Sequence, residues 1–144
     1  MSSATTPQGS LIIPTIRYKD APAAIDWLAR AFGFEARLVV PDGAGGVAHA
    51  QLTYKNGMIM LGTASDDEFG RLQASLASTT STVSQSAYVV VEDVDAHHAA
   101  ALSAGASVVT EPIDQDHGGR YYACRDPEGN LWNFGSYDPW VPAE

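Results

Sequence analysis

The residues with the widest range of chemistry in this chain are four histidines and one cysteine. His49 lies in a stretch, 47–54, where the residues at every second position share a character, which predicts a strand. The row of Ala48, Ala50 and Leu52 suits packing under a helix, so we expect His49 and Gln51 to face a cleft. A histidine has an ordinary pKa near neutrality, which suits a general base. A histidine that only hydrogen-bonds to a neighbour, and a glutamine on a plain sheet surface, are the simpler alternatives.

The other histidines and the cysteine are weaker candidates. His97 and His98 are adjacent on a predicted helix and point about 100° apart, so they cannot hold one metal together. His117 lies in an acidic loop, 114–119, which either folds over the mouth of a cleft or is an ordinary surface loop. Cys124 has no visible base or electropositive setting to make it a nucleophile, so we expect it to be buried. A single cysteine also excludes an internal disulfide.

Composition excludes several classes of partner. The 144 residues include 8 basic and 17 acidic side chains, for a formal net charge of −9, which argues against binding to nucleic acid or an anionic membrane. No run of about 18 apolar residues is present, which argues against a membrane span. The first ten residues lack the positive and apolar regions of a secretory signal, which predicts a cytoplasmic protein.

The first half of the chain predicts a strand, a helix and three further strands. Residues 11–18 are apolar and β-branched, Asp20 can cap a helix that ends at Gly33, and 35–40 reads as a second strand. Residues 47–54 and 58–63 flank the pair Asn56-Gly57, which is typical of a two-residue hairpin turn.

The same order of elements is predicted again in the second half. Residues 87–91 form a strand, Asp93 caps a helix closed by Gly105, and 107–110 is a strand that ends near Pro112. Residues 120–125 and 130–136 form a closing hairpin around a turn that carries Pro127 and Gly129. Between the halves, 64–85 is predicted to be a linker, with a possible short helix around 68–77; a cover over a site is the alternative.

The repeated order indicates an internal duplication. Asp20 matches Asp93 at an offset of 73 residues, and Gly33 and Gly57 match Gly105 and Gly129 at an offset of 72. We therefore predict an α+β fold of two tandem βαβββ units, whose sheets curl around a shared cleft with the helices outside. The predicted parts are an N-terminal tail at 1–10, the first unit at 11–63, the linker at 64–85, the second unit at 86–138 and a C-terminal tail at 139–144.

Three motifs carry a resemblance to a known family. They are RYKDAPAAIDWL at 17–28, VEDVDA at 91–96 and DPEGNLWNFG at 126–135. Together with the duplication, they resemble the vicinal oxygen chelate superfamily, which includes glyoxalase I, bleomycin- and fosfomycin-resistance proteins and extradiol dioxygenases. The resemblance spans roughly residues 10–138. It implies the fold strongly and the reaction weakly, because one scaffold serves unrelated chemistries in this superfamily.

The resemblance also implies where a metal would bind. Metal-dependent members carry one ligand on the first strand and one on the last strand of each unit. Counting from the shared landmarks, these positions are Ile13, Leu61 (or Met60), Ser86 (or Ala87) and Asn133. None of them offers an imidazole or a carboxylate, which divalent metals prefer. The chain is therefore similar to the metal-free branch that includes the bleomycin-binding proteins, and we expect neither a metal nor another cofactor.

Strand alternation assigns the remaining candidates to a mainly apolar and aromatic pocket. We expect Tyr121 to face the cleft, and Tyr122 and Cys124 to face inward. The last strands are expected to turn Ile59, Leu61, Leu131 and Asn133 to the cleft, and Met58, Met60, Trp132 and Phe134 to the core. The candidate ligand-binding residues are Thr15, Arg17, His49, Gln51, Tyr88, Tyr121 and Asn133.

Three functions follow as hypotheses. The first is a metal-independent binder of a small organic molecule, which would sequester a drug or a metabolite. The second is a metal-independent isomerase or lyase that uses acid–base chemistry at His49, Tyr121 or Arg120. The third is a structural or regulatory dimer. The resemblance implies a homodimer, and the aromatic residues Tyr137 and Trp140 require burial either on their own domain or on a second subunit.

Overall fold

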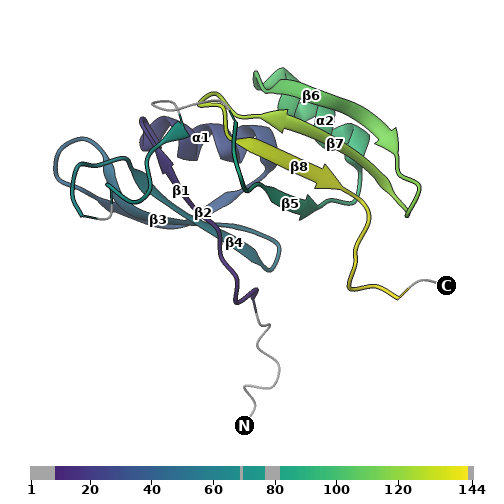
Figure 1. The fold of residues 1–144 in the computed structure, drawn as a ribbon, viewed down its shortest axis with the longest axis horizontal. Coiled ribbons are helices and arrows are strands. Elements are labelled where there is room, and N and C mark those ends of the chain that lie inside the picture. The colour runs from purple at the N-terminus through teal and green to yellow at the C-terminus, as the bar shows by residue number, and fades with distance from the viewer. Residues whose placement is uncertain (1–8, 69, 77–81, 143–144) are drawn as a thin grey trace, which may run out of the picture. The chain divides into compact units, whose positions relative to one another are not determined.

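The computed structural model describes residues 9–68, 70–76 and 82–142, which form two compact units (Figure 1). Unit 1 comprises Met1–Ala29 and Gly33–Ser75, and unit 2 comprises Arg30–Phe32 and Leu76–Glu144. Each unit contains one four-stranded sheet, and the element order βαβββ occurs twice along the chain. The predicted α+β fold of two βαβββ repeats is therefore confirmed. Among the described residues, no helix has the length and apolar character needed to cross a membrane.

The sheet of unit 1 has the strand order β1-β4-β3-β2. Its strands are β1 (Thr15–Tyr18), β2 (Glu35–Pro41), β3 (Val47–Tyr54) and β4 (Gly57–Thr63), and β1 pairs with β4 in parallel while the other pairs are antiparallel. Helix α1 (Ala21–Phe32) begins where the Ala23 amide donates to Asp20 Oδ1 at 3.1 Å. It ends at Gly33, whose φ of 84° suits glycine, so both predicted helix boundaries are confirmed.

Two details of unit 1 differ from the sequence prediction. β1 starts at Thr15 rather than at residue 11, because Pro14 has no N–H to donate, and Leu11 and Ile12 are exposed. The β3–β4 loop consists of Lys55 and Asn56, since Tyr54 pairs with Gly57. Lys55 has a φ of 52°, in the left-handed region, so the turn lies at Lys55-Asn56, one residue before the predicted pair Asn56-Gly57.

The sheet of unit 2 repeats this order as β5-β8-β7-β6. Its elements are β5 (Ala87–Val90), α2 (Val94–Ser103), β6 (Ser107–Asp114), β7 (Arg120–Arg125) and β8 (Leu131–Gly135). Asp93 caps α2 as predicted, accepting from the Ala96 amide at 3.0 Å. β6 continues past Pro112, where the prediction ended it, because it is an edge strand with an irregular register between Thr110 and Ile113.

The segment between the repeats contains no regular helix in its described part. Residues 70–75 form turns and irregular structure rather than the predicted helix, and residues 69 and 77–81 lie outside the described residues. Asp67 organises the start of this segment, where its side chain accepts from the Gly70 amide at 2.8 Å. Gln73 Nε2 donates to the carbonyl of Thr15 at 2.8 Å, which ties the segment to β1.

Aromatic side chains form the core of unit 2. Tyr122, Trp132 and Phe134 are each at most 1% exposed, and the rings of Tyr122 and Phe134 are stacked 5.3 Å apart. Phe32, at the end of α1, lies 4.6 Å from Phe134 between ring centroids. Tyr122 and Cys124 face inward, as strand alternation predicted, and burial raises the pKa of the Cys124 thiol to about 12. This cysteine is therefore a packed, protonated core residue.

His97 is a polar member of this core. Its Nε2 lies 3.1 Å from the Phe32 carbonyl, which only accepts, so Nε2 carries the proton and Nδ1 accepts from the Tyr122 hydroxyl at 2.6 Å. Burial lowers the pKa of His97, because a charged imidazole would lose its hydration. The neighbouring His98 is placed differently, with Nε2 3.2 Å from Glu111 Oε1.

Asp126 organises the turn between β7 and β8. Its carboxylate is 4% exposed and accepts from the amides of Glu128 and Asn130, each at 3.0 Å. It also accepts from the indole Nε1 of Trp132 at 3.1 Å, which links the turn to the core. Gly129 completes the turn with φ of 93°.

Replacing Asp126 with Ala should destabilise the protein by about 2–4 kcal/mol, because the buried Trp132 N–H and the turn amides lose their acceptor. Urea unfolding measures this loss. Asp42→Ala is the matched control: Asp42 also accepts from two turn amides, at Ala44 and Gly46, but it is exposed, so water replaces it. A loss for Asp126→Ala no larger than for Asp42→Ala would contradict the role of Asp126.

The stability contributed by His97 should decrease on acidification. In the unfolded chain the imidazole takes up a proton near its ordinary pKa of 6.5, while the folded pKa is lower. Between these two values the unfolded state binds more protons, so this contribution is complete above pH 6.5 and is lost as the pH falls toward the folded pKa. An NMR titration of the His97 ring tests this directly, and a pKa at or above 6.5 would refute it.

Candidate functional site

Strand pairing places several of the predicted residues of unit 2 on one face of its sheet. Asn133 pairs with Tyr88 on β5 and with Ala123 on β7, and paired residues of neighbouring strands project to the same face. Tyr121 pairs with Gly135 and lies on this face as well. The opposite face carries the buried core residues Tyr122, Trp132 and Phe134.

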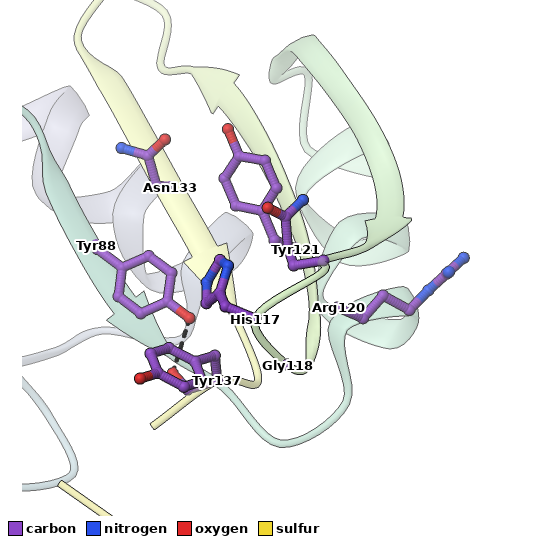
Figure 2. A pocket seen from close by; sticks show the side chains of 8 residues that line it. Tyr88, His117, Gly118, Arg120, Tyr121, Asn133 and Tyr137 are labelled. Carbon is purple, nitrogen blue, oxygen red and sulfur yellow. Dashed lines mark hydrogen bonds between the residues drawn. The ribbon is translucent and has the colours of Figure 1, made fainter. Parts of the chain in front are cut away.

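A cavity of about 220 Å³ lies on this face of unit 2 (Figure 2). It will be called the unit 2 cavity. Three neighbouring strands and the loop before β7 contribute side chains to it. Its lining residues are Tyr88, Gln115, His117, Gly118, Arg120, Tyr121, Asn133 and Tyr137. Three of the sequence-predicted ligand residues, Tyr88, Tyr121 and Asn133, therefore share one cavity.

Tyr88 is held across the sheet by its hydroxyl group. Tyr88 Oη donates to the carbonyl of Tyr137 at 2.8 Å, as the dashed line in Figure 2 shows. A side chain at Gly135 would collide with the Tyr88 hydroxyl, so the glycine leaves the space that this ring occupies. Burial raises the pKa of Tyr88, which keeps the hydroxyl protonated and able to donate.

The loop before β7 lines the cavity through His117, whose ring contacts Tyr137 edge-on at 4.8 Å between centroids. Gly118 has φ of 127° and lies against the Tyr137 ring. The sequence was compatible with two interpretations of this loop, a cover over the mouth of a cleft and an ordinary surface loop. It contributes an exposed histidine to the cavity lining.

Arg120 lines the cavity but directs its charge elsewhere. Its guanidinium contacts Asp95 Oδ2 at 3.1 Å and Asp114 Oδ1 at 3.2 Å, and Figure 2 shows the side chain pointing away from Tyr88 and Asn133. The hydrogen bonds to Asp95 and Asp114 raise the pKa of Arg120. This arginine therefore remains charged and cannot serve as the acid or base that the sequence analysis considered.

Asn133 has a defined orientation. Its Nδ2 donates to Ser86 Oγ at 2.9 Å and to the carbonyl of Ala87 at 3.1 Å. A carbonyl oxygen only accepts, so the nitrogen must face Ala87 and the amide oxygen must face the other way. Figure 2 shows this oxygen on the side of Tyr121.

Unit 1 carries a smaller cavity, of about 160 Å³, at the corresponding place on its own sheet. It will be called the unit 1 cavity. The correspondence follows from strand pairing. Thr15 on β1 pairs with Met60 on β4, and Tyr88 on β5 pairs with Asn133 on β8 in the same way. Its lining residues are Thr15, Ile16, Arg17, Ala48, His49, Met60, Leu61 and Gly62.

The pairing corrects the predicted register of β4. Ile59 and Leu61 are each 4% exposed and belong to the core row, whereas Met58 and Met60 share the face of Thr53 and Gln51. Met60 rather than Leu61 therefore corresponds to Asn133. Four residues separate the paired residues Thr53 and Met58, and five separate the equivalent pair Arg125 and Leu131. The offset between the repeats therefore grows from 72 on β3 and β7 to 73 on β4 and β8.

The predicted polar residues of unit 1 are already engaged with neighbours. His49 Nε2 lies 3.1 Å from Gln51 Nε2, and both side chains are half-buried on the predicted face. Arg17 Nη1 donates to the Thr63 carbonyl at 3.3 Å and passes over Gly62, where a Cβ atom would lie 2.6 Å from this nitrogen. Thr15, His49 and Arg17 thus line one cavity, and Gln51 supports His49.

The residues at the family's metal positions do not fit a divalent metal. In the described part of the chain, no cluster of three or more His, Cys, Asp or Glu side chains could hold a metal ion. In unit 2 the two positions are occupied by Ser86 and Asn133, which are bonded to each other, and in unit 1 the last-strand position is the thioether of Met60. These are neutral groups and weak ligands for such ions.

Comparison with known proteins identifies the family. Residues 11–134 match the family model described as Glyoxalase/Bleomycin resistance protein/Dioxygenase superfamily. The Mycobacterium bovis protein Mb0911c, which is uncharacterised, is 35% identical over 125 residues, covering 85% of this chain and 80% of that protein. The crystal structure of TioX from Micromonospora sp. ML1 matches with a TM-score of 0.68 and 33% identity, covering 88% of this chain and 98% of that one.

A more distant structure supports the fold alone. A glyoxalase/bleomycin resistance protein/dioxygenase family enzyme from Burkholderia phytofirmans PsJN matches with a TM-score of 0.63 and 19% identity, covering 84% of this chain and 93% of that one. The family match and the duplicated βαβββ units agree. The chain belongs to the Glyoxalase/Bleomycin resistance protein/Dioxygenase superfamily.

Proposed function

We propose that this protein is a metal-independent binder of a small organic molecule, with the unit 2 cavity at the centre of the site. The observation that carries the proposal is the hydrogen bond of 2.9 Å between Asn133 and Ser86. The resemblance to metal-dependent members of the family implies metal ligands of unit 2 at Asn133 and at Ser86 (or Ala87). Here Asn133 and Ser86 form a neutral pair, in which Asn133 lines the aromatic cavity and Ser86 accepts a hydrogen bond from Asn133.

The chemistry of this pair explains why a metal would bind poorly. The amide nitrogen of Asn133 cannot coordinate a cation, and it is engaged with Ser86 and Ala87. The amide oxygen alone is a single neutral donor, whereas divalent ions require several, usually including charged groups. Binding therefore depends on the organic surface of the cavity rather than on a metal.

The size and lining of the unit 2 cavity suit part of an organic ligand. Its volume of about 220 Å³ is below the roughly 300–1,000 Å³ of pockets for drug-sized molecules, so it accommodates a ring rather than a whole large ligand. Three tyrosines supply the apolar walls, and Asn133 and His117 supply polar contacts. Such a mixture of aromatic surface and a few polar groups is typical of small-molecule sites.

A homodimer is part of this proposal. Trp140, beyond the last strand, is 92% exposed, while Tyr137 is partly held by its carbonyl contact with Tyr88. A large exposed indole near a chain end is suited to burial in a subunit interface.

Metal analysis of the protein purified without a tag should find less than about a tenth of an equivalent of Ni, Zn, Fe or Mn, because the donor groups are neutral. Thermal-shift screening in the presence of EDTA should still reveal stabilising organic ligands. Stoichiometric, tightly held metal would overturn the metal-independent proposal. Stabilisation that disappears with EDTA would do so as well.

A second candidate function is a metal-independent isomerase or lyase acting on a small organic acid. It is favoured by one observation: His49 and Arg17 line the same unit 1 cavity. An arginine can bind a carboxylate while a nearby histidine moves a proton. Tyr121, the other acid–base candidate, belongs to unit 2.

Replacing His49 with Ala tests this second function in an assay of turnover. If His49 is the general base, kcat should fall by roughly 100-fold or more, since acid–base catalysis typically contributes that much. His98→Ala is the matched control, because His98 lies on α2 of unit 2 and lines neither cavity, so this change should leave such turnover intact. Unchanged turnover in His49→Ala would remove His49 as the base.

A further inference from the structure

The charges around the unit 2 cavity indicate which ligands it disfavours. Arg120 is the formal cation among its lining residues, and its guanidinium is bound by Asp95 and Asp114 on the far side from Tyr88. Asp138 is near enough to Tyr88 to act on it electrostatically. The whole chain carries a formal net charge of −9. An anionic group entering this cavity would meet no cation directed at it.

Asn133 gives the cavity a hydrogen-bond acceptor. Its nitrogen donates to Ser86 and Ala87, so the group it presents toward Tyr121 is the amide oxygen. An N–H or O–H group of a ligand can donate to this oxygen. A ligand carboxylate placed there would instead bring its oxygen against the amide oxygen of Asn133, and neither group has a proton to donate.

The aromatic walls of the cavity favour a planar ligand. Tyr88 is 42% exposed, and its hydroxyl is fixed to the Tyr137 carbonyl, so its ring is held in place. Tyr121 and His117 border the same space, as Figure 2 shows. Planar rings pack well against aromatic side chains, and a positive charge is further attracted to the faces of tyrosine rings.

We propose that the unit 2 cavity binds a planar aromatic ring that carries an N–H donor, neutral or cationic, and that it discriminates against anionic analogues. This inference rests on the proposed function and names its ligand class. The amide oxygen of Asn133 accepts the hydrogen bond from the N–H group, and the tyrosine rings pack against the ring of the ligand. The position of the N–H donor toward Asn133 then determines how the ring is oriented.

The corresponding position in unit 1 supplies the test variant. Met60 takes the place of Asn133 in an equivalent pair of strands, so a methionine is compatible with this point of the sheet. Asn133→Met removes the acceptor while keeping a side chain of similar length. Leu131→Met is the matched control, because Leu131 lies two residues earlier on the same face and outside the cavity lining.

The experiment is an NMR titration of the ¹⁵N-labelled full chain with four probes: indole, 1-methylindole, tryptamine and indole-3-acetate. Indole should shift the amide signals of Tyr88, Tyr121 and Asn133, and should bind about 2- to 10-fold more tightly than 1-methylindole, which lacks the N–H donor. Tryptamine should bind at least as tightly as indole. Among the three probes that have an N–H group, indole-3-acetate should bind most weakly.

Asn133→Met should abolish the preference for indole over 1-methylindole, and Leu131→Met should retain it. A preference that survives in Asn133→Met, or indole-3-acetate binding as tightly as tryptamine, overturns the inference. If Asn133→Met does not fold, equal binding of indole and 1-methylindole to the unaltered chain overturns it just as well.

The same titration separates this inference from the proposed function. Shifts at the cavity with the wrong order of affinities would refute the ligand class and leave the cavity as a binding site. No shift at the cavity with any of the probes would refute the ligand class, and an additional absence of cavity shifts across a broad organic library would refute the proposed function.

Discussion

The buried carboxylate of Asp126 is the constraint on which unit 2 most depends. It accepts from the amides of Glu128 and Asn130 and from the indole of Trp132, so a single side chain joins the turn, the last strand and the core. Because this turn fixes how β8 pairs with β7, it also fixes which residues of β8 face the cavity. A shift of one residue would bury Asn133 and turn Trp132 toward solvent.

The two repeats show the consequence of a one-residue difference in this turn. The connection from Thr53 to Met58 has four residues and presents Met60 on the cavity face, whereas the equivalent connection from Arg125 to Leu131 has five and presents Asn133. Glycines at corresponding positions, Gly62 and Gly135, let a side chain from the first strand lie over the sheet in both units. That side chain is Arg17 in unit 1 and Tyr88 in unit 2. One architecture thus holds two cavities with different chemical character.

Local signals were sufficient to predict most of the fold. Helix caps such as Asp20 and the alternation around His49 depend on residues within a few positions of one another. The cap is observed, and the alternation is observed from His49 to Leu52, whereas Ala48 is exposed instead of packed under a helix. The errors arose where distant residues decide the outcome. Pro112 is tolerated because β6 lies at the edge of its sheet, and the face of Met60 depends on loop length. Neither fact is contained in the local sequence pattern.

The candidate site was predictable in its residue types but not in its charges. Alternation placed Tyr88, Tyr121 and Asn133 on one face, yet the partners of Arg120 come from α2 and β6, and no spacing rule indicates that they neutralise it. Both this neutralisation of Arg120 and the neutral amide of Asn133 leave the site without a charge directed into it. A site without directed charge holds a metal poorly and also attracts anions poorly. The proposed metal independence and the proposed preference for uncharged or cationic rings therefore share one physical origin.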